Sequence, residues 1–539
     1  VNLITFIHAH GTAFIDGNER FNKDLERYNL TKYYWGKIKY QFNYDSENPS
    51  IYDFLIEVFN ANFSLGNTST LSKESRLLLS LWKDTIQYRD SFGQIASKVE
   101  EDLEVEEKLN RVSLDSIIND DLFRTTDLKI IHELINLIAN EEISYDKLIQ
   151  HVKTRENKYW YKQTENFYHA IEFGAEMIAL VRKYANKKYS NFDEGVKDYS
   201  SNLYIIDQTY RKFIYYQRQT NQNRILAELA EKVEKVYSND WLLHYNNNWQ
   251  SVINDVDSWP NSERYSQQRF FEQHVKQFTS KKNRLFVIIS DALRYECGAE
   301  LSRKLLSENR YESSIDFMVT SLPSYTQLGM ASLLPHKEIQ FNEQSDSIVL
   351  DGISASGTPN RAKILATNSG VRATAIKAED FMKMNSSTEG REFAKQHDLI
   401  YIYHNRIDKT GDDKASEEKV FEAVDAELDY LMDLMKKIAN VNGNHMMITS
   451  DHGFIYQHQP LDESDFSASK HNGDLWKENR RFVIGKNISA DDSTKKFSAN
   501  QLNIQSDAEV LIPKSINRLR IKGAGSRFIH GGASMQEIV

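Results

Sequence analysis

The sequence predicts a mainly α-helical region over residues 1–280, with room for more than one subdomain, followed by an α/β domain over residues 281–539. A chain of 539 residues is too long to share one hydrophobic core. Up to residue 280, segments such as "RILAELAEKVEKVY" place apolar residues three and four positions apart, as amphipathic helices do. Beyond it, short apolar runs alternate with helical patterns, which indicates a largely parallel sheet flanked by helices.

The clearest feature of the α/β domain is a predicted βαβ unit. A helix over residues 417–438, with apolar side chains on one face, lies between apolar runs at 399–404 and 445–450. The turn "NVNGN" precedes the second run, and its Gly443 supplies the backbone freedom that a helix end needs. The candidate strands of the domain are 285–290, 316–321, 399–404, 445–450, 481–485 and 516–521.

Composition limits the class of protein. Hydrophobic residues make up 40% of the chain, and no run reaches the roughly 18 apolar residues of a membrane span. The single cysteine, Cys297, excludes a disulfide framework and is typical of the reducing cytoplasm, where we expect the protein. No signal peptide is visible, but the chain begins with Val1 and stops at "QEIV", so we expect a piece of a longer protein.

The charge pattern bears on nucleic-acid binding. A formal net charge of −10 argues against broad coating of nucleic acid, yet it leaves room for a local basic groove. Three basic clusters are candidates for guiding a strand, at 281–284, 477–481 and 518–527. Ordinary solvated lysines and arginines are the simpler explanation.

Acidic residues follow three of the apolar runs. They are Asp291, Asp408 with Asp412, and Asp451, which His452 follows directly. Helix capping explains one such residue, for example Asp291, but it explains three and an adjacent histidine poorly. Parallel strands bring their carboxyl ends together, and gathered carboxylates need a positive counter-charge, so we expect divalent metal. Oxygen and imidazole ligands suit Zn²⁺, Mn²⁺ or Mg²⁺, and the histidines favour Zn²⁺.

Two further residues extend this set. Thr326 lies in "SLPSYTQLGMASLLP" near the start of a predicted helix, whose N–H groups would stabilise an alkoxide or a phosphate. His530 precedes two glycines in "FIHGGASMQEIV", and glycines let a backbone approach a site closely. The alternatives are a helix cap for Thr326 and a surface histidine for His530.

In this order, the residues resemble the alkaline phosphatase superfamily, whose pattern is Asp, a Ser or Thr nucleophile, Asp-x-x-x-His, Asp-His and a final His. Longer motifs such as "SDALRYECGAEL", "YHNRIDKTGDD" and "FIHGGASMQEIV" are similar to the PglZ family of bacterial BREX phage-defence systems. The motifs span residues 285 to 539. The resemblance implies an alkaline-phosphatase-like domain that is incomplete at its C-terminal end, with other BREX defence proteins as partners.

The resemblance also implies the roles of the site residues. One metal ion would be held by Asp291, Thr326, Asp451 and His452, and the other by Asp408, Asp412 and His530. Thr326 would be the catalytic nucleophile, with two ions stabilising the attacking and leaving oxygens.

Two points modify this assignment. The superfamily has His where this chain has Asp412, so Mn²⁺ or Mg²⁺ becomes an alternative to Zn²⁺ at the second position. Ser324, two residues before Thr326, is an alternative nucleophile. The candidates for holding phosphate oxygens are Arg294, His404, Asn405 and Arg527.

The predicted function is that of a cytoplasmic, metal-dependent hydrolase of phosphate esters, a phosphatase or phosphodiesterase of antiviral defence with nucleotides or DNA as candidate substrates. The alternative is a largely non-catalytic scaffold or a sensor of a phosphorylated ligand within the defence complex. Phosphoryl transfer within a sugar phosphate ranks third. Such enzymes insert a cap domain, and the interval of about 80 residues between Thr326 and Asp408 is short for one.

Overall fold

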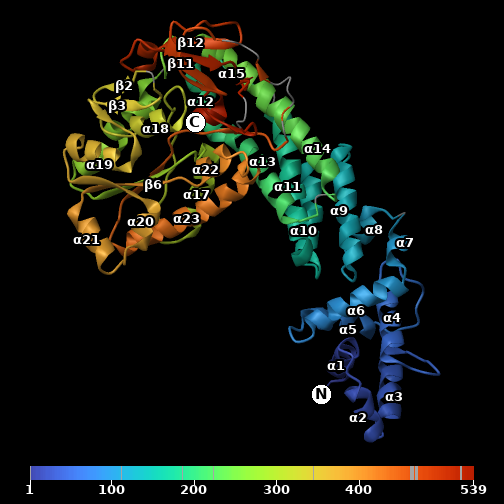
Figure 1. The fold of residues 1–539 in the computed structure, drawn as a ribbon. Coiled ribbons are helices and arrows are strands. Elements are labelled where there is room, and N and C mark those ends of the chain that lie inside the picture. Colours follow the sequence, from blue (N-terminus) through green and yellow to red (C-terminus); the bar gives the residue numbers. More distant parts are fainter. Residues whose placement is uncertain are drawn as a thin grey trace. The chain divides into compact units, whose positions relative to one another are not determined.

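The computed structural model describes residues 2–110, 112–184, 186–222, 224–260, 262–343, 345–459, 461, 466–467, 471–521 and 525–539. The chain divides into two compact units (Figure 1). Unit 1 comprises Val1–Ala175 with Tyr216–Ala230, and unit 2 comprises Glu176–Tyr215 with Glu231–Val539.

Unit 1 is helical, as predicted. Its helices are α1 (Leu3–Ile15), α2 (Arg20–Arg27), α3 (Thr31–Phe42), α4 (Ile51–Asn62), α5 (Glu74–Asp84), α6 (Arg89–Asp102), α7 (Val105–Leu109), α8 (Leu114–Ile117), α9 (Arg124–Ala139) and α10 (Tyr145–Glu156). Ser50 caps α4 by accepting the Asp53 N–H, as polar residues at helix starts do. Inside the unit, the buried Arg155 guanidinium is paired with Asp127, which also accepts a hydrogen bond from Tyr168.

Helices that precede residue 280 also belong to unit 2. They include α12 (Phe192–Asp198) and α15 (His244–Asn254), while α11 (Tyr161–Tyr184), α13 (Tyr204–Gln219) and α14 (Ala227–Lys235) cross the limits of the units. Trp249 on α15 donates a hydrogen bond to the Ala533 carbonyl over 3.0 Å, so α15 packs directly on the α/β part. The predicted domain limits at residues 280 and 281 stay a prediction.

The centre of unit 2 is a parallel sheet of β1 (Leu285–Ser290), β5 (Ala373–Lys377), β6 (Leu399–His404) and β7 (Met446–Thr449), in the order β5-β6-β1-β7. Every residue of β1 and β6 is buried, which explains their uninterrupted apolar sequences. The predicted βαβ unit is confirmed: α23 (Val420–Asn440) connects the parallel strands β6 and β7, between which β1 is inserted.

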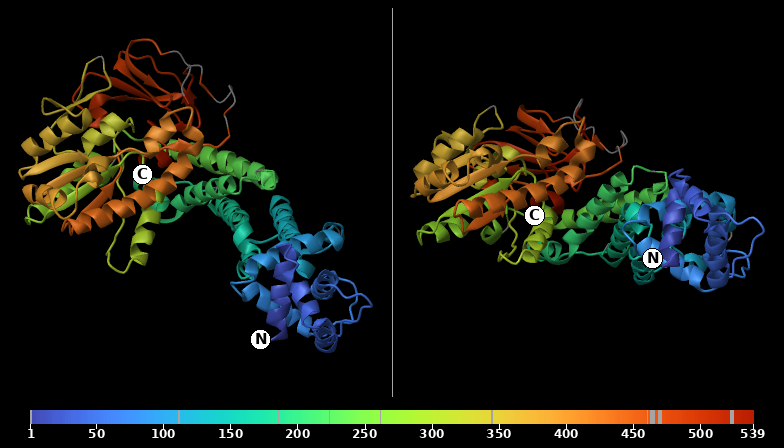
Figure 2. Two further views of the ribbon diagram at one scale, coloured as in Figure 1. Left: turned by 60° about the horizontal axis from the view of Figure 1, so that its bottom comes forward. Right: turned by 90° about the horizontal axis from the view of Figure 1, so that it is seen from below.

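Helices flank this sheet, as Figures 1 and 2 show. They are α17 (Tyr295–Ser307), α18 (Thr326–Ser332), α19 (Gly357–Asn368), α20 (Ala378–Lys383), α21 (Glu389–Gln396), α22 (Ile407–Asp412) and α23. The last helix, α24 (Met535–Ile538), is buried within unit 2, where Glu537 is paired with Arg481 over 2.7 Å.

A second, antiparallel sheet lies in the C-terminal part of unit 2, with the order β10-β11-β13-β12. Its strands are β10 (Asp474–Asn479), β11 (Phe482–Lys486), β12 (Thr494–Ser498) and β13 (Glu509–Pro513). The shorter strands are β2 (Ile339–Phe341), β3 (Ile348–Leu350), β4 (Ile353–Ser354), β8 (Ile455–Tyr456), β9 (Phe466–Ser467), β14 (Arg518–Leu519) and β15 (Phe528–Ile529).

The predicted strand at 316–321 is wrong. In this segment the structure has a single bridge, between Val319 and Ser266. The Val319 N–H pairs with the Tyr265 carbonyl and the Thr320 N–H with the Ile538 carbonyl, so two different segments share the backbone groups that one neighbouring strand would use. The predicted strand at 516–521 is reduced to the two residues of β14.

Candidate metal centre

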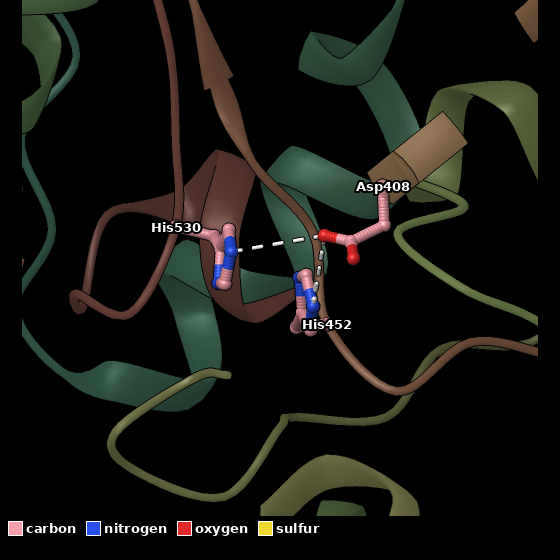
Figure 3. A group of neighbouring side chains, drawn as sticks. All are labelled: Asp408, His452 and His530. Carbon is pink, nitrogen blue, oxygen red and sulfur yellow. Dashed lines mark ion pairs between the residues drawn. The ribbon is translucent and has the colours of Figure 1, made fainter. Parts of the chain in front are cut away.

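Five side chains form two overlapping clusters at the carboxyl ends of β1, β6 and β7. One cluster contains Asp291, Asp451 and His452, and the other contains Asp408, His452 and His530. Within each, one potential ligand atom per residue lies within 4.8 Å of the others. In Figure 3, the Asp408 carboxylate and the two imidazole rings of the second cluster converge. Parallel pairing explains this, because Ser290 is in register with His404 and Ile289 with Thr449, so the three strands end together.

His452 occupies the middle of the two clusters. Its Nε2 lies 3.5 Å from Asp291 Oδ1, 3.6 Å from Asp451 Oδ2 and 3.9 Å from Asp408 Oδ1. The ring is buried, and it stacks on the ring of His530 with the centroids 4.2 Å apart. A single imidazole therefore adjoins all three strand-end carboxylates.

His530 completes the other half of the site. Its Nε2 lies 3.4 Å from Asp412 Oδ1 and 3.7 Å from Asp408 Oδ1. Asp412 ends α22 and its side chain is 57% exposed, so this half opens toward solvent. His530 itself is buried, which rules out the alternative of a surface histidine.

Both histidines are oriented by backbone carbonyls. His452 Nδ1 lies 2.9 Å from the Gly453 carbonyl, and His530 Nδ1 lies 3.4 Å from the Ser324 carbonyl. A carbonyl only accepts, so each Nδ1 donates, and each Nε2 points at the carboxylates. This is the usual arrangement of metal-binding histidines, in which the outer hydrogen bond fixes the ring and the other nitrogen binds the ion.

Thr326 adjoins the shared histidine. Its Oγ1 lies 3.2 Å from His452 Nε2. It is the first residue of α18, whose N-cap is Tyr325, so Thr326 is not the helix cap. Ser324 is engaged differently, because its hydroxyl donates to the Gly532 carbonyl over 2.7 Å. The geometry thus favours Thr326 over Ser324 as the hydroxyl of the site.

Asp291 does not cap a helix either. Helix α17 begins at Tyr295 with Arg294 as its N-cap. Asp291 instead sits at the end of β1, followed by Ala292 with a φ of 63°, a left-handed conformation that a residue with a Cβ rarely adopts. This turn aims the Ala292 N–H at Asp451 Oδ1, 3.1 Å away, and so links the ends of β1 and β7.

The carboxylates repel one another, and burial adds to the effect. Burial raises the pKa of Asp291, with further rises from the charges of Asp451 and Asp408. Burial likewise raises the pKa of Asp408 to about 7, against the opposing charge of His530. The anionic forms of Asp291 and Asp408 are therefore disfavoured in this site unless positive charge is added.

The histidines respond in opposite directions. Burial lowers the pKa of His452, so its ring is neutral near pH 7. Burial also acts to lower the pKa of His530, but its hydrogen bond with Asp412 and the charges of Asp408 and Asp412 raise it to about 9. Although burial opposes it, the same contact with His530 lowers the pKa of Asp412.

The donor set fits a divalent cation. Three buried carboxylate oxygens, Asp291 Oδ1, Asp408 Oδ1 and Asp451 Oδ2, accept no hydrogen bond within the described part of the chain. All three are the atoms that face His452 Nε2. Buried acceptors without donors are costly, and bound cations satisfy them. Carboxylate oxygens and imidazole nitrogens are ligands for Zn²⁺ and Mn²⁺.

A buried glutamine connects the loop before Thr326 to the end of β7. Gln267 Nε2 donates to the Asp451 carbonyl over 2.6 Å, and its Oε1 accepts the Ser321 N–H over 3.1 Å. Ser450 accepts the Leu293 N–H over 2.8 Å. The loop that leads to Thr326 is thereby tied to the end of β7 and the turn after β1.

Three of the four predicted phosphate-binding candidates are engaged by other carboxylates. Arg294 pairs with Glu296 over 2.7 Å, His404 with Glu427 over 2.6 Å, and Arg527 with Glu418 over 3.6 Å. The fourth, Asn405, is hydrogen-bonded to the Asp408 carboxyl, and this contact acts to lower the pKa of Asp408. Asn405 thus reaches a cluster member through its side chain, and His404 reaches one through its backbone carbonyl, which accepts the Asp291 N–H over 2.9 Å.

The charges of two cations act on the site; Lys477 belongs to the predicted basic cluster at 477–481, whereas Arg361 was not anticipated from the sequence. The charge of Arg361, which is buried and stacks on Tyr403 at 4.7 Å, acts to lower the pKa of Asp291. The charge of Lys477 on β10 acts to lower the pKa of Asp412. No local pattern distinguishes Arg361 on α19, and none within 477–481 singles out Lys477.

Comparison with known proteins gives the family. Residues 270–539 match the model of the BREX system PglZ alkaline phosphatase-like domain. The chain therefore belongs to this family, with a helical region preceding an alkaline phosphatase-like α/β domain.

Its relatives include two alkaline phosphatase-like proteins. It is 32% identical over 569 residues to the alkaline phosphatase-like protein BrxZ of Escherichia coli O9:H4 (strain HS), covering 100% of this chain and 65% of that protein. It is 31% identical over 557 residues to the alkaline phosphatase-like protein PglZ of Bacillus cereus (strain H3081.97), covering 100% of this chain and 64% of that protein. The chain thus spans less than two thirds of the length of these curated relatives.

Among solved structures, murine ectonucleotide pyrophosphatase/phosphodiesterase 5 aligns with a TM-score of 0.30 at 12% identity, over 48% of this chain and 86% of that chain. Within the described residues, no helix has the length and apolar character needed to cross a membrane.

Proposed function

We propose that this protein is a metal-dependent hydrolase of phosphate esters, acting foremost on phosphodiesters of nucleotides or nucleic acid, in a BREX-type antiphage defence system. The observation that carries the proposal is the convergence of Thr326, three buried carboxylates and two oriented histidines at one edge of the sheet. Membership in the PglZ family supports the defence context, other BREX proteins as partners and a cytoplasmic location, all of which stay predictions.

In this proposal the site holds two divalent ions. Asp291, Thr326, Asp451 and His452 bind one, and Asp408, Asp412 and His530 bind the other. When bound, such ions supply Lewis acidity, which lowers the pKa of a hydroxyl and neutralises charge on phosphoryl oxygens. Zn²⁺ suits the first position, and the carboxylate of Asp412 keeps Mn²⁺ or Mg²⁺ open at the second.

The residues of the chain have separate tasks. His452 is neutral near pH 7, because burial lowers its pKa, so its Nε2 lone pair is free to bind. Thr326 Oγ1, held beside that nitrogen, would lose its proton and attack phosphorus; the bond to the ester oxygen breaks, the leaving oxygen takes up a proton and departs as the alcohol, and a phospho-threonine remains. A water molecule then hydrolyses the phospho-threonine, which restores the hydroxyl and releases phosphate or a phosphomonoester.

The test uses the purified chain, an aryl phosphodiester and an aryl phosphomonoester. We expect hydrolysis that EDTA abolishes, that Zn²⁺ or Mn²⁺ restores, and that Thr326→Ala reduces at least a hundredfold. Ser324→Ala is the matched control, because its hydroxyl is bound to Gly532. Equal activity of Thr326→Ala and the unsubstituted protein would exclude the covalent step. Metal binding without turnover of any ester would favour the scaffold or sensor.

A further inference from the structure

Strand β10 contains an irregularity where it pairs with β11, the strand whose Phe482 packs on Tyr325 with the ring centroids 4.9 Å apart. It pairs with β11 from Asp474 opposite Lys486 to Asn479 opposite Phe482, and the register shifts between Leu475 and Lys477. One extra residue in a strand is a β-bulge, which bends the strand and redirects the next side chain. Bulges are frequent next to functional sites for this reason. The residue redirected here is Lys477.

Lys477 is linked to the residue that precedes the proposed nucleophile. Its Nζ lies 3.0 Å from Asp346 Oδ2, and the Asp346 carbonyl accepts the Tyr325 hydroxyl over 2.7 Å. Tyr325 immediately precedes Thr326. On the other side, the charge of Lys477 reaches Asp412, whose pKa it acts to lower.

Lys477 shares a face of the β10–β11 pair with Phe482, whose ring lies 4.9 Å from the ring of Tyr325, and a Cβ added at Gly531, next to His530, would lie 2.4 Å from that Phe482 ring. The ammonium group therefore stands on the face that adjoins the segments of Thr326 and His530.

This lysine differs from the other cations around the site. The guanidinium of Arg361 is buried against Tyr403 and donates to the Ala355 carbonyl, and Arg294 is buried against Glu296. The Lys477 side chain is 42% exposed, and its ion-pair partner among the described residues is Asp346, whose side chain is 31% exposed. A partly exposed pair exchanges partners at little energetic cost. A substrate anion can take the place of Asp346.

The neighbouring arginines do not share this property. In the cluster at 477–481, Arg480 donates to the Leu519 and Ile521 carbonyls, and Arg481 is paired with Glu537 inside the unit. The cluster at 518–527 includes residues 522–524, which lie outside the described residues. Within 477–481, a phosphate-directed role therefore falls to Lys477 rather than to the cluster as a whole.

We propose that Lys477 binds the phosphate adjacent to the scissile one, so that the site recognises phosphodiesters that carry a second phosphate, such as oligonucleotides. The inference rests on the proposed function and deepens it. In this proposal the scissile group lies among the carboxylates and histidines, whereas Lys477 stands outside them, on the strand pair that packs on Tyr325 and Gly531. A lysine contributes a point charge suited to a neighbouring phosphate that is held without chemistry.

The test compares Lys477→Met with Asp346→Asn on two substrates. One is a short oligonucleotide, and the other is an aryl phosphodiester without a second phosphate. We expect Lys477→Met to raise KM for the oligonucleotide about tenfold, the usual effect of one lost charged contact. The kcat of Lys477→Met for the oligonucleotide, and its kcat and KM for the aryl diester, should stay within twofold of the values of the unsubstituted protein. Asp346→Asn should leave KM for the oligonucleotide equal or lower, because the lysine is released.

A binding measurement gives a second readout. For a phosphorothioate oligonucleotide, Lys477→Met should reduce the slope of log K against log salt by about one, as the loss of one phosphate contact does. Lys486→Met is the matched control, since Lys486 pairs with Glu343 in the loop of Asp346 and with Asp507, and within the described part of the chain no ion pair joins it to the metal centre. An unchanged slope would overturn the proposal. If Lys477→Met and Asp346→Asn instead reduce the hydrolysis of both substrates equally, the ion pair of Lys477 and Asp346 only positions the loop. That outcome would also overturn the proposal.

Failure of the proposed function is distinguishable from failure of this inference. If the unsubstituted protein hydrolyses neither substrate, the hydrolase proposal fails while the salt slope still reports on Lys477. If the aryl diester is hydrolysed and the Lys477→Met protein binds and cleaves the oligonucleotide normally, the hydrolase stands and the second-phosphate contact is wrong.

Discussion

The carboxylate of Glu427 on α23 is fully buried and lies 2.6 Å from Nδ1 of His404, the last residue of β6. The same carboxylate accepts the Ser290 hydroxyl over 2.7 Å. Ser290 immediately precedes Asp291, and His404 stands four residues before Asp408. One side chain of the crossover helix therefore fixes the ends of the two strands that present these acids.

We expect Glu427→Gln to weaken metal binding about tenfold, because residues that orient metal ligands have effects of this size. The amide would place an N–H against a hydrogen-bond donor, which also destabilises the fold by about 1–3 kcal/mol. Competition with a chelator and thermal unfolding measure the two effects. Glu379→Gln is the control, because Glu379 lies 3.6 Å from the other nitrogen of His404 but is 54% exposed. Equal metal affinity in both variants would contradict the orienting role.

In the metal-free protein, Asp408 and His530 should each make a contribution to stability that falls with rising pH, opposite in sign to that of His452, whose pKa is lowered. The pKa of Asp408 is raised to about 7 in the folded chain, against about 3.9 when unfolded. Between these values the folded state retains a proton that the unfolded state has lost, so stability decreases as pH rises. The pKa of His530 is raised to about 9, against about 6.5 unfolded. Its contribution is complete below pH 6.5 and is lost through pH 9.

Thermal unfolding in EDTA from pH 5 to 9 tests this expectation. Added Zn²⁺ or Mn²⁺ should raise Tm more at pH 8.5 than at pH 6, because binding requires deprotonated ligands. Asp408→Asn should flatten the pH dependence between pH 5 and 7. A Tm of the EDTA-treated protein that rises with pH over this range, and equally so in Asp408→Asn, would refute the assignment.

The strand-end acids could be predicted from the sequence because strands β1, β6 and β7 are local patterns. Their apolar runs were located to within a residue, and parallel pairing then requires that their carboxyl ends meet. The segment 316–321 is wrongly predicted as a strand because Met318 and Val319 resemble one. Its backbone partners come from separate segments, which no local pattern reveals.

The residues that position the metal ligands could not be predicted from the sequence, for a different reason. Glu427 lies on a helix whose apolar stripe is clear, but its own position looks like one of many charged residues. Gln267 stands alone and Lys477 is one of several basic residues at 477–481, and their roles follow from contacts with segments more than 50 residues away. Such contacts arise from tertiary packing, which hydrophobic periodicity does not encode.

Close packing of α18 against β7 gives another prediction. A Cβ added at Gly329 would lie 2.3 Å from the Asp451 carbonyl oxygen, a backbone atom that cannot move aside. Gly329→Ala should therefore push α18, and Thr326 at its start, away from the metal ligands. We expect a destabilisation of about 1–3 kcal/mol and a loss of hydrolysis beyond it.

Gly298→Ala is the matched control on α17. There an added Cβ meets nothing nearer than the Ile315 side chain at 3.7 Å, so this helix should gain slightly in stability. Unfolding and activity assays on the two variants separate the effects. If Gly329→Ala unfolds and hydrolyses as Gly298→Ala does, α18 is not positioned by its contact with Asp451.

Asp412 should set the metal preference of the second position. Its carboxylate lies 3.4 Å from His530 Nε2, where the wider superfamily has an imidazole. A hard oxygen ligand favours Mn²⁺ or Mg²⁺, and an imidazole favours Zn²⁺. We therefore expect Asp412→His to raise the affinity for Zn²⁺ relative to Mn²⁺ about tenfold.

The substitution should also remove the interaction that stabilises protonated His530, so metal binding in Asp412→His should persist to a lower pH. Asp413→His, at the adjacent exposed residue, tests whether any added histidine has this effect. Metal content after dialysis against mixed Zn²⁺ and Mn²⁺, measured by elemental analysis at pH 6 and pH 8, distinguishes the variants. The same Zn²⁺ to Mn²⁺ ratio in Asp412→His and the unsubstituted protein would show that Asp412 does not bind the second ion.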